Sequence, residues 1–457
     1  VLAVGYFLKF IIIKLVRILK YHQKNRNVEW SLIIIIFYFT IFQDFIFAIL
    51  FQYHFVNAII VKIIYLFKDI IVIALGTVNV IALIAKKRIY RSDLFAYFFI
   101  VYLLISTTIS GAGWINRFVS LRTYVLPIAL YFIGRNIKLN KVVYHSFLKN
   151  VFFLSFIMSS TAIFERFVLP VSFWEHTVNL MNFNVNGKGM SDFSGIGNLV
   201  DNFYTGGNRR AIGIAGDPLF LSYFLIPLFF LLLCHYIFSK NYKKTTFILL
   251  IMTLFTQIIT LTRAVLTSEF ISLAIILLIF NFKLFIRNRR LKFLFLLLVI
   301  SILTFYNQIQ NLIVQTITFQ DGGSFLTHLN SLQIGIQQFI SSLCGNGIGT
   351  SSVMNAAMGS GTSIENTYLN LGIETGFIGI VLFLLFWSSL IKGAIHSYKK
   401  ISRDYNNYSS IYLAAIFSTG ALFITGFISP ELWAMKSVIL YWVLMGMAQK
   451  PLLNNQS

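Results

Sequence analysis

Long apolar runs are the feature that most limits how this chain can fold. A membrane-spanning helix needs about 20 predominantly apolar residues, and twelve runs of about that length recur along the 457 residues: 29–50, 67–85, 94–110, 118–134, 147–165, 218–238, 246–262, 264–282, 293–308, 371–391, 410–428 and 435–448. Charged residues make up only 11% of the chain, about half the share in a soluble domain. This composition excludes a soluble enzyme, a secreted disulfide scaffold and a disordered tail. The expected fold is all-α, a single polytopic membrane domain over 1–457.

The distribution of Lys and Arg predicts the orientation of that domain. If the N-terminus is cytoplasmic, the segments on that side hold 27 of the 37 Lys and Arg residues: 1–28, 86–93, 134–149, 239–244, 283–292, 392–408 and 449–457. Cytoplasmic loops are enriched in these residues, so both termini are expected inside. The net charge of +22 is therefore interpreted as a topology signal and not as a sign of nucleic-acid binding.

Three segments outside the predicted spans stand out. The first, 1–28, is predicted as a cytoplasmic amphipathic helix at the membrane interface, because its cations Lys9, Lys14, Arg17 and Lys20 fall within an arc of about 140°. The other two, 166–217 and 309–370, are long loops on the external side. Long loops usually carry function, so binding residues are expected there.

Two external arginines are the first candidate site residues. Arg210 lies where the first long loop re-enters the membrane, and Arg263 lies at a short external turn. Two guanidinium groups at this surface could bind a diphosphate bidentately, whereas Lys would act only as a point charge. The alternative is that each reaches the interface or pairs with Asp217 or Glu269. Arg122, beside the fourth span, has the same two interpretations.

Glu365 is the candidate acid. Ser363 is predicted to cap the tenth span, which would place Glu365 in its first turn, on one face with Tyr368. A carboxylate there is also favoured by the helix dipole alone. Glu374 lies about 13.5 Å deeper along the helix and is interpreted as a buried structural acid with a cationic or polar partner.

His328 and the segment 345–350 are weaker candidates. His328 begins a stretch with helical spacing and could donate to a phosphate or a sugar, or simply be solvated or cap the helix. The segment GNGIGT at 345–350 could offer backbone N–H groups to an anion, but it lacks the Gly-Lys-Ser/Thr of a P-loop. Neither Cys234 nor Cys344 has metal-ligand spacing, so no metal site and no cofactor are expected.

Six motifs resemble, in order, those of the Wzy-type oligosaccharide repeat-unit polymerases, GT-C-like relatives of the O-antigen ligases. They are ERFVLPVSFW at 165–174, NFYTGGNRRAIGIAGDPLFLSYF at 202–224, ITLTRAVL at 259–266, HLNSLQIG at 328–335, CGNGIGTS at 344–351 and ENTYLNLGIETGFIG at 365–379. The resemblance implies a metal-independent glycosyltransferase of the bacterial inner membrane. It would move a growing glycan from undecaprenyl diphosphate onto a lipid-linked repeat unit at the periplasmic face.

The resemblance also implies roles for residues. Arg210 and Arg263 would correspond to the essential external arginines of the family and bind the diphosphate. The ligases typically carry His at the start of the tenth span, so Glu365 favours a polymerase and would be its general base. His328 stands where many relatives have Arg. Further candidates for substrate binding are Arg122, His328, Tyr368 and Asp217.

The implied partners are undecaprenyl-diphosphate-linked oligosaccharides, the lipid bilayer and a chain-length regulator protein. Three other functions remain open from the sequence. A ligase would transfer the glycan to a lipid A core from the same donor site. A flippase would also have about twelve spans, but its external loops would normally be short. A non-catalytic scaffold would need no such set of arginine and glutamate residues.

Overall fold

The computed structural model describes residues 28–137, 139–188, 204–205, 208–239, 242–280, 324–351, 364–401, 408–429 and 431–450. These residues are mostly helical. The α-helices are α2 (Val28–Gln52), α3 (Ala58–Ala85), α4 (Arg91–Thr108), α5 (Trp114–Asn136), α6 (Lys141–Phe167), α7 (Leu180–Asn182), α9 (Pro218–Phe238), α10 (Lys243–Ile259), α11 (Arg263–Phe280), α15 (Ser324–Ser341), α17 (Thr367–Lys399), α18 (Ser409–Thr425) and α19 (Met435–Met447).

Short elements connect several of these helices. Two π-helical turns, η1 (Phe173–Val178) and η2 (Phe183–Gly187), flank α7, and two 3-10 turns, η4 (Gly213–Ala215) and η6 (Glu431–Trp433), precede α9 and α19. The strands β1 (Tyr204–Thr205) and β2 (Asn208–Arg209) form a small antiparallel hairpin. The prediction of an all-α fold is confirmed, apart from this hairpin.

Eleven of the twelve apolar runs coincide with helices in the described part of the chain. The twelfth, 293–308, lies outside the described residues, as do 1–27 of the predicted amphipathic segment and parts of both long loops. Among the described helices, four are long and apolar enough to cross a membrane: α2 from Trp30 onward, α6, α9 and α17. These helices indicate that the protein associates with a membrane.

Polar residues fix where several helices begin. The side chain of Asn57 accepts a hydrogen bond from Ile60 N at the start of α3, and Asn140 caps α6 in the same way through Val143 N. Such caps satisfy backbone donors that have no partner inside the helix. Short polar segments therefore separate the apolar runs into individual helices.

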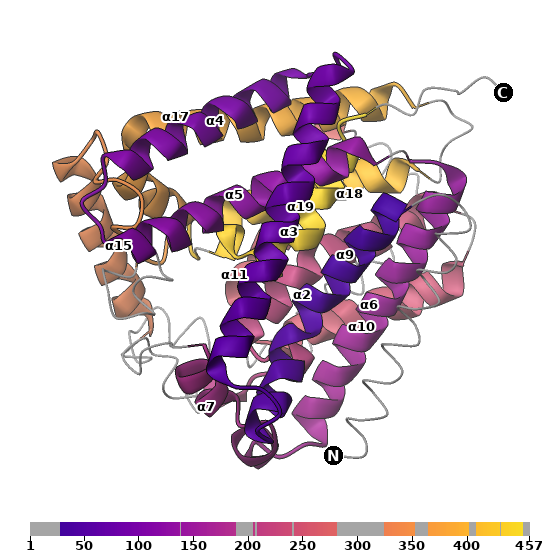
Figure 1. Cartoon of the computed structure of the whole chain (residues 1–457). Coiled ribbons are helices and arrows are strands. Elements are labelled where there is room, and N and C mark those ends of the chain that lie inside the picture. Colours follow the sequence, from indigo (N-terminus) through magenta and orange to yellow (C-terminus); the bar gives the residue numbers. More distant parts are fainter. Residues whose placement is uncertain are drawn as a thin grey trace.

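Helices α9 and α19 form the centre of the bundle, and most of their side chains are buried. Helix α9 packs against α18 and α10, while α19 packs against α5 (Figure 1). Helices α5 and α19 approach closely at two glycines, because a Cβ on Gly134 would lie 2.2 Å from Val443 O and one on Gly446 would lie 2.2 Å from Tyr131 O. Helices α4 and α17 lie side by side along the upper edge of the view.

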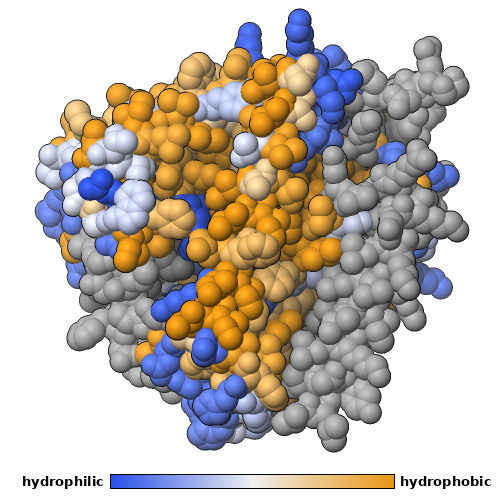
Figure 2. Space-filling view, in the orientation of Figure 1, coloured by the Kyte–Doolittle hydropathy of each residue, from blue (hydrophilic) through white to orange (hydrophobic). Residues whose placement is uncertain are grey.

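Apolar side chains cover much of the outer surface of this bundle. Figure 2 shows them as a continuous area over α3 and α4. On α3, Ile59, Ile63 and Phe67 are more than half exposed, and on α4 so are Phe98 and Val101. Contiguous apolar area of this kind is uncommon on soluble proteins and is suited to contact with lipid chains.

Candidate functional site

A sharp turn between α10 and α11 brings the two predicted arginines together. Leu261 has a left-handed backbone conformation, with φ of 53°, which ends α10 and lets Arg263 begin α11 two residues later. The chain that enters α9 runs beside this turn, since Ala211 N donates to Ile259 O at 2.9 Å. Arg210, the neighbour of Ala211, therefore also lies at the turn.

Contacts with the same turn hold the Arg210 guanidinium. Its Nε donates to Thr260 O at 2.9 Å, and its Nη2 donates to Thr262 Oγ1 at 3.1 Å. Within the described parts of the chain, its Nη1 has no hydrogen-bond partner. Burial lowers the pKa of Arg210, the nearby charge of Arg263 lowers it further, and Asp217 opposes both. The turn thus carries two close positive charges, and one of them has an edge available to a ligand.

The adjacent Arg209 has a different environment. Its Nη2 lies 2.6 Å from Glu165 Oε1, and its Nη1 donates to Leu169 O. Glu165 is buried, and its other carboxylate oxygen accepts from Ile212 N at 2.9 Å and Gly213 N at 3.3 Å. The Arg209–Glu165 pair therefore anchors the re-entering segment to the end of α6. Its hydrogen bonds are made within the protein.

Two other candidates also have partners inside the protein. Asp217 caps α9, because its Oδ1 accepts from Phe220 N at 2.8 Å. Arg122 on α5 forms an ion pair with Asp69 on α3 at 3.2 Å, and Lys68 pairs with the same carboxylate at 3.3 Å. The pairing that the sequence left as an alternative for Arg122 is thus present, but with Asp69.

A charged cluster near the end of α2 was missed by the sequence analysis. Asp44 lies 2.6 Å from Lys436 Nζ and 3.1 Å from Lys188 Nζ, and it accepts a hydrogen bond from Tyr65. Lys436 also donates to Ala215 O at 2.9 Å. An acid in an apolar run is costly without a partner, so Asp44 within 29–50 was the signal available in the sequence. The cluster joins α2, α3, η2, η4 and α19.

Glu431 adjoins this cluster and was also missed. It accepts a hydrogen bond from Ser437 Oγ at 2.5 Å. The pKa of Glu431 is raised to about 7, mainly by burial and also by the negative charge of Asp217, whereas Ser437 and Lys436 lower it. Asp217 acts on both Arg210 and Glu431. Glu431 therefore belongs to the electrostatic surroundings of the arginine turn.

The predicted position of Glu365 is wrong by a few residues. Helix α17 begins at Thr367, and its cap is Asn366, whose Oδ1 accepts from both Tyr368 N and Leu369 N at 2.9 Å. Glu365 precedes this cap and is not in the first turn, while Ser363 lies outside the described residues. Because the Asn366 amide oxygen accepts from two backbone N–H groups, Asn366 is the N-cap of α17 in place of Ser363.

Contacts with α18 fix the start of α17, two residues after Glu365. Thr367 N donates to Gly426 O at the C-terminal end of α18, and the Tyr368 hydroxyl donates to Phe423 O at 2.7 Å. The hydroxyl of Tyr368 is thus engaged by α18. Glu365 N donates to Ser331 Oγ on α15 at 3.1 Å.

Helix α11 runs against α18, and Ser272 Oγ donates to Phe417 O at 2.7 Å. Arg263 precedes Ser272 by nine residues, and Gly426 follows Phe417 by nine. Nine residues rise about 13.5 Å in each helix. Asp217 acts both on Arg210 at the turn and on Glu431, which follows α18, so the start of α11 and the end of α18 lie on the same side. Arg263 therefore lies at about the level of Gly426, which Thr367 contacts.

The segment 345–351 uses its N–H groups on the protein itself. Gly349 N and Ser351 N donate to Glu374 Oε1 at 3.0 and 3.2 Å, and Glu374 is fully buried. The interpretation of Glu374 as a buried acid with polar partners is confirmed. The anion bound by these N–H groups is its carboxylate, which corrects the idea of an external ligand there.

His328 lies in α15, and its side chain is outside the described part of the structure. Among the described residues, no group of three His, Cys, Asp or Glu side chains could hold a metal ion. The chain matches no family model and no curated protein.

Proposed function

We propose that this chain is a membrane glycosyltransferase that polymerises oligosaccharide repeat units from undecaprenyl diphosphate. The observation that supports this function most is the placement of Arg210 and Arg263 on one turn. The two cations repel each other and Asp217 offsets only part of their charge, and a diphosphate carries the charge and geometry to bind both. The exposed apolar surface of α3 and α4 would contact the same lipid chains in which the polyprenyl chain lies.

The proposed topology has twelve spans in the bacterial inner membrane, both termini in the cytoplasm and the active site in the periplasm. Under this topology the α10–α11 turn, the start of α17 and the end of α18 all lie outside. Arg210, Arg263 and Glu365 then share one side of the membrane. The 27 cations on the opposite side follow the usual inside preference.

In the proposed reaction, a hydroxyl oxygen of the incoming repeat unit attacks the anomeric carbon of the growing glycan. The bond between that carbon and the diphosphate oxygen breaks, and undecaprenyl diphosphate leaves with the electron pair. Arg210 and Arg263 would stabilise the negative charge that develops on the leaving group. Glu365 would accept the proton of the attacking hydroxyl.

The direct test is an assay of purified protein with one undecaprenyl-diphosphate oligosaccharide, with EDTA and without ATP, measured as a glycan ladder. A ladder is expected from the wild type. Arg210→Lys should lower the rate roughly tenfold to a hundredfold, because Lys cannot reproduce the charge-assisted contacts of a guanidinium. Arg166→Lys is the matched control, since Arg166 lies in the last turn of α6 and contacts the ring of Phe167, away from the α10–α11 turn; its ladder should be normal.

Glu365→Gln tests the general base in the same assay. Chain growth should stop while lipid-linked repeat units accumulate, because the amide cannot accept the proton. Glu175→Gln, which changes an acid of the first long loop, is the control and should keep the ladder. A normal ladder from Glu365→Gln would remove this residue from the mechanism.

The same assay separates the other functions. If no ladder forms but a lipid A core becomes glycosylated, the protein is a ligase. If neither product forms, the glycosyltransferase proposal fails and a transporter or a scaffold gains support.

A further inference from the structure

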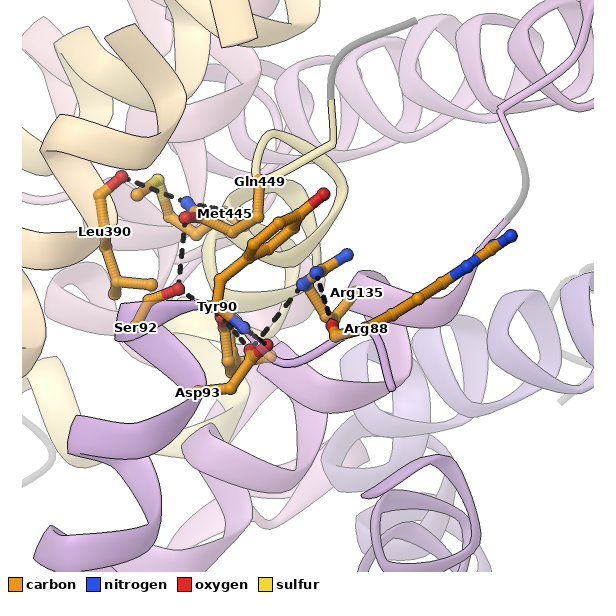
Figure 3. Close-up of polar contacts among 9 residues, drawn as sticks. Arg88, Tyr90, Ser92, Asp93, Arg135, Leu390, Met445 and Gln449 are labelled. Carbon is orange, nitrogen blue, oxygen red and sulfur yellow. Dashed lines mark hydrogen bonds and ion pairs between the residues drawn. The ribbon is translucent and has the colours of Figure 1, made fainter. Parts of the chain in front are cut away.

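A buried ion pair lies near the C-terminal end of α3, away from Lys68 and Asp69. Arg135 on α5 and Asp93 on α4 are both fully buried, with Arg135 Nε 3.5 Å from Asp93 Oδ1. Arg135 Nη2 donates to Arg88 O at 3.1 Å, so the guanidinium also holds the turn between α3 and α4. Figure 3 shows these contacts.

The carboxylate of this pair serves several donors at once. Asp93 accepts from Tyr131 OH at 2.6 Å and from Tyr90 N at 2.8 Å in addition to its contact with Arg135. The Tyr90 ring covers the guanidinium, with 4.0 Å from Arg135 Cζ to the ring centroid. Arg135 Nη1 is buried and has no hydrogen-bond partner in the described part of the chain. Its positive charge is therefore only partly satisfied.

Further cations surround Arg135. The pKa of Lys450 is lowered to about 8, mainly by burial and also by the charges of Arg135, Arg88 and Lys86, while Asp93 opposes them. Lys86 and Arg88 are exposed, and the Arg88 side chain extends outward from the ion pair (Figure 3). Three cations and a single acid, Asp93, thus act on Lys450.

Hydrogen bonds of Gln449, the neighbour of Lys450, join the helices beside this cluster. Gln449 Nε2 donates to Leu390 O on α17 at 3.0 Å, and Gln449 Oε1 accepts from Ser92 Oγ on α4 at 3.3 Å (Figure 3). A Cβ on Gly393 would lie 2.0 Å from Gln449 Oε1, so only glycine leaves room for this amide. The bonds hold α4, α17 and the end of α19 together under Lys450.

The sides of the cluster are apolar. Ile81 and Ile84 on α3 are 60% and 50% exposed, and Leu94 and Phe98 on α4 are 45% and 59% exposed. These side chains lie on the two helices that meet at the Arg88 turn. A molecule that combines a phosphate with apolar chains would contact both parts of this surface.

We propose that Arg88, Arg135 and Lys450 form a binding site for a phosphate group at this end of the bundle. A phosphate would offset the positive charge of Arg88 and Lys450 and of the buried, only partly paired Arg135 behind them. The apolar flanks fit the acyl chains of an anionic phospholipid. This site is independent of the proposed glycosyltransferase function and of the orientation of the chain, because both leaflets of a membrane contain phosphate headgroups.

The test uses the purified full-length chain in detergent and two probes, phosphatidylglycerol and inorganic phosphate. Native mass spectrometry would count retained lipids, and thermal unfolding would report stabilisation, with phosphatidylcholine and equal ionic strength of chloride as references. Arg88→Gln and Lys450→Gln should each weaken binding about fivefold, the effect of one surface cation. Lys399→Gln, an exposed cation at the end of α17, is the matched control and should bind as the wild type does.

Each outcome is decisive. Stabilisation by phosphatidylglycerol alone identifies a lipid headgroup, and equal stabilisation by inorganic phosphate identifies a soluble source, and both support the site. The proposal is overturned if neither probe stabilises the wild type, or if Lys399→Gln weakens binding as much as the other two variants. Arg135 is not substituted, because its loss would leave Asp93 buried without its cation and could prevent folding.

Discussion

At the scale of single residues, two adjacent arginines have opposite environments. Arg209 ends β2, and successive side chains of an extended chain point to opposite sides. Arg209 therefore points toward Glu165, whereas Arg210 points toward the α10–α11 turn. The sequence places both in one long loop and does not separate them, because their partners are more than 40 residues away. Only the partner distinguishes an arginine that anchors the chain from one that could bind substrate.

Glu431 gives a prediction about pH. Its pKa is raised from the ordinary 4.5 to about 7, so the folded protein keeps this proton while the unfolded chain loses it near pH 4.5. Stability should therefore fall as pH rises from about 4.5 to about 7. Glu431→Gln cannot ionise and should unfold several degrees above the wild type at pH 8, with little difference at pH 4.5. Thermal unfolding of purified protein in detergent measures both.

The control for Glu431 is Glu175→Gln, which changes an acid on η1, outside this cluster. It should leave the pH profile of the wild type unaltered. If Glu431→Gln instead destabilises the protein equally at both pH values, the hydrogen bond from Ser437 matters more than the buried charge.

At the scale of elements, the helical hydrogen bonds of α17 are interrupted at Gly376, and the segment 343–347 supplies replacements. Gly376 has φ of 70° and ψ of −173° inside this helix, which frees backbone groups on both sides. Asn346 N and Gly347 N donate to the carbonyls of residues 373 and 374 at 2.7 and 2.9 Å, and Phe377 N donates to Leu343 O at 2.9 Å. The glycine-rich segment thus replaces the hydrogen bonds that the break removes.

Gly347 should tolerate no side chain. Its φ is 92°, and a Cβ would lie 2.3 Å from Ser110 Cα. Gly347→Ala therefore combines backbone strain with a steric clash against the backbone of Ser110. We expect a loss of about 2 kcal/mol or more, measured as a lower unfolding temperature and lower yield in the membrane. Gly111→Ala is the matched control, because nothing lies within 4 Å of its Cβ position, and it should unfold as the wild type does.

The elements show why part of the structure could be predicted and part could not. Apolar runs predict helices because length and hydrophobicity are local properties, and eleven runs coincide with helices in the described residues. The start of α17 was misplaced because Ser363 and Asn366 are both good caps. The role of 345–351 was not predictable, since its partner Glu374 is reached only after folding. The role of Asp44 was not predicted because its partners Lys188 and Lys436 are distant in the sequence and come near it only in the folded protein.

At the scale of the whole molecule, two groups of charged side chains lie apart from each other. One group comprises the arginine turn, the Asp44 cluster and the start of α17, and the other comprises the Arg135–Asp93 pair. Burial of charge is least costly where water or headgroups are near. The two proposed anion sites, one for a diphosphate and one for a phosphate, would then lie on opposite sides of one membrane.

The orientation of these groups can be tested with the native cysteines. Cys344 is exposed beside the glycine-rich segment, and Cys234 is fully buried in α9. The proposed topology places Cys344 outside, so a membrane-impermeant maleimide should add one label per chain in intact spheroplasts, and none to Cys344→Ser. A reporter for the other side is Lys399→Cys in the Cys344→Ser background, which should react only after the membrane is permeabilised. Labelling of Cys344 only after permeabilisation would invert the topology and move the arginine turn into the cytoplasm, where a periplasmic polymerase could not operate.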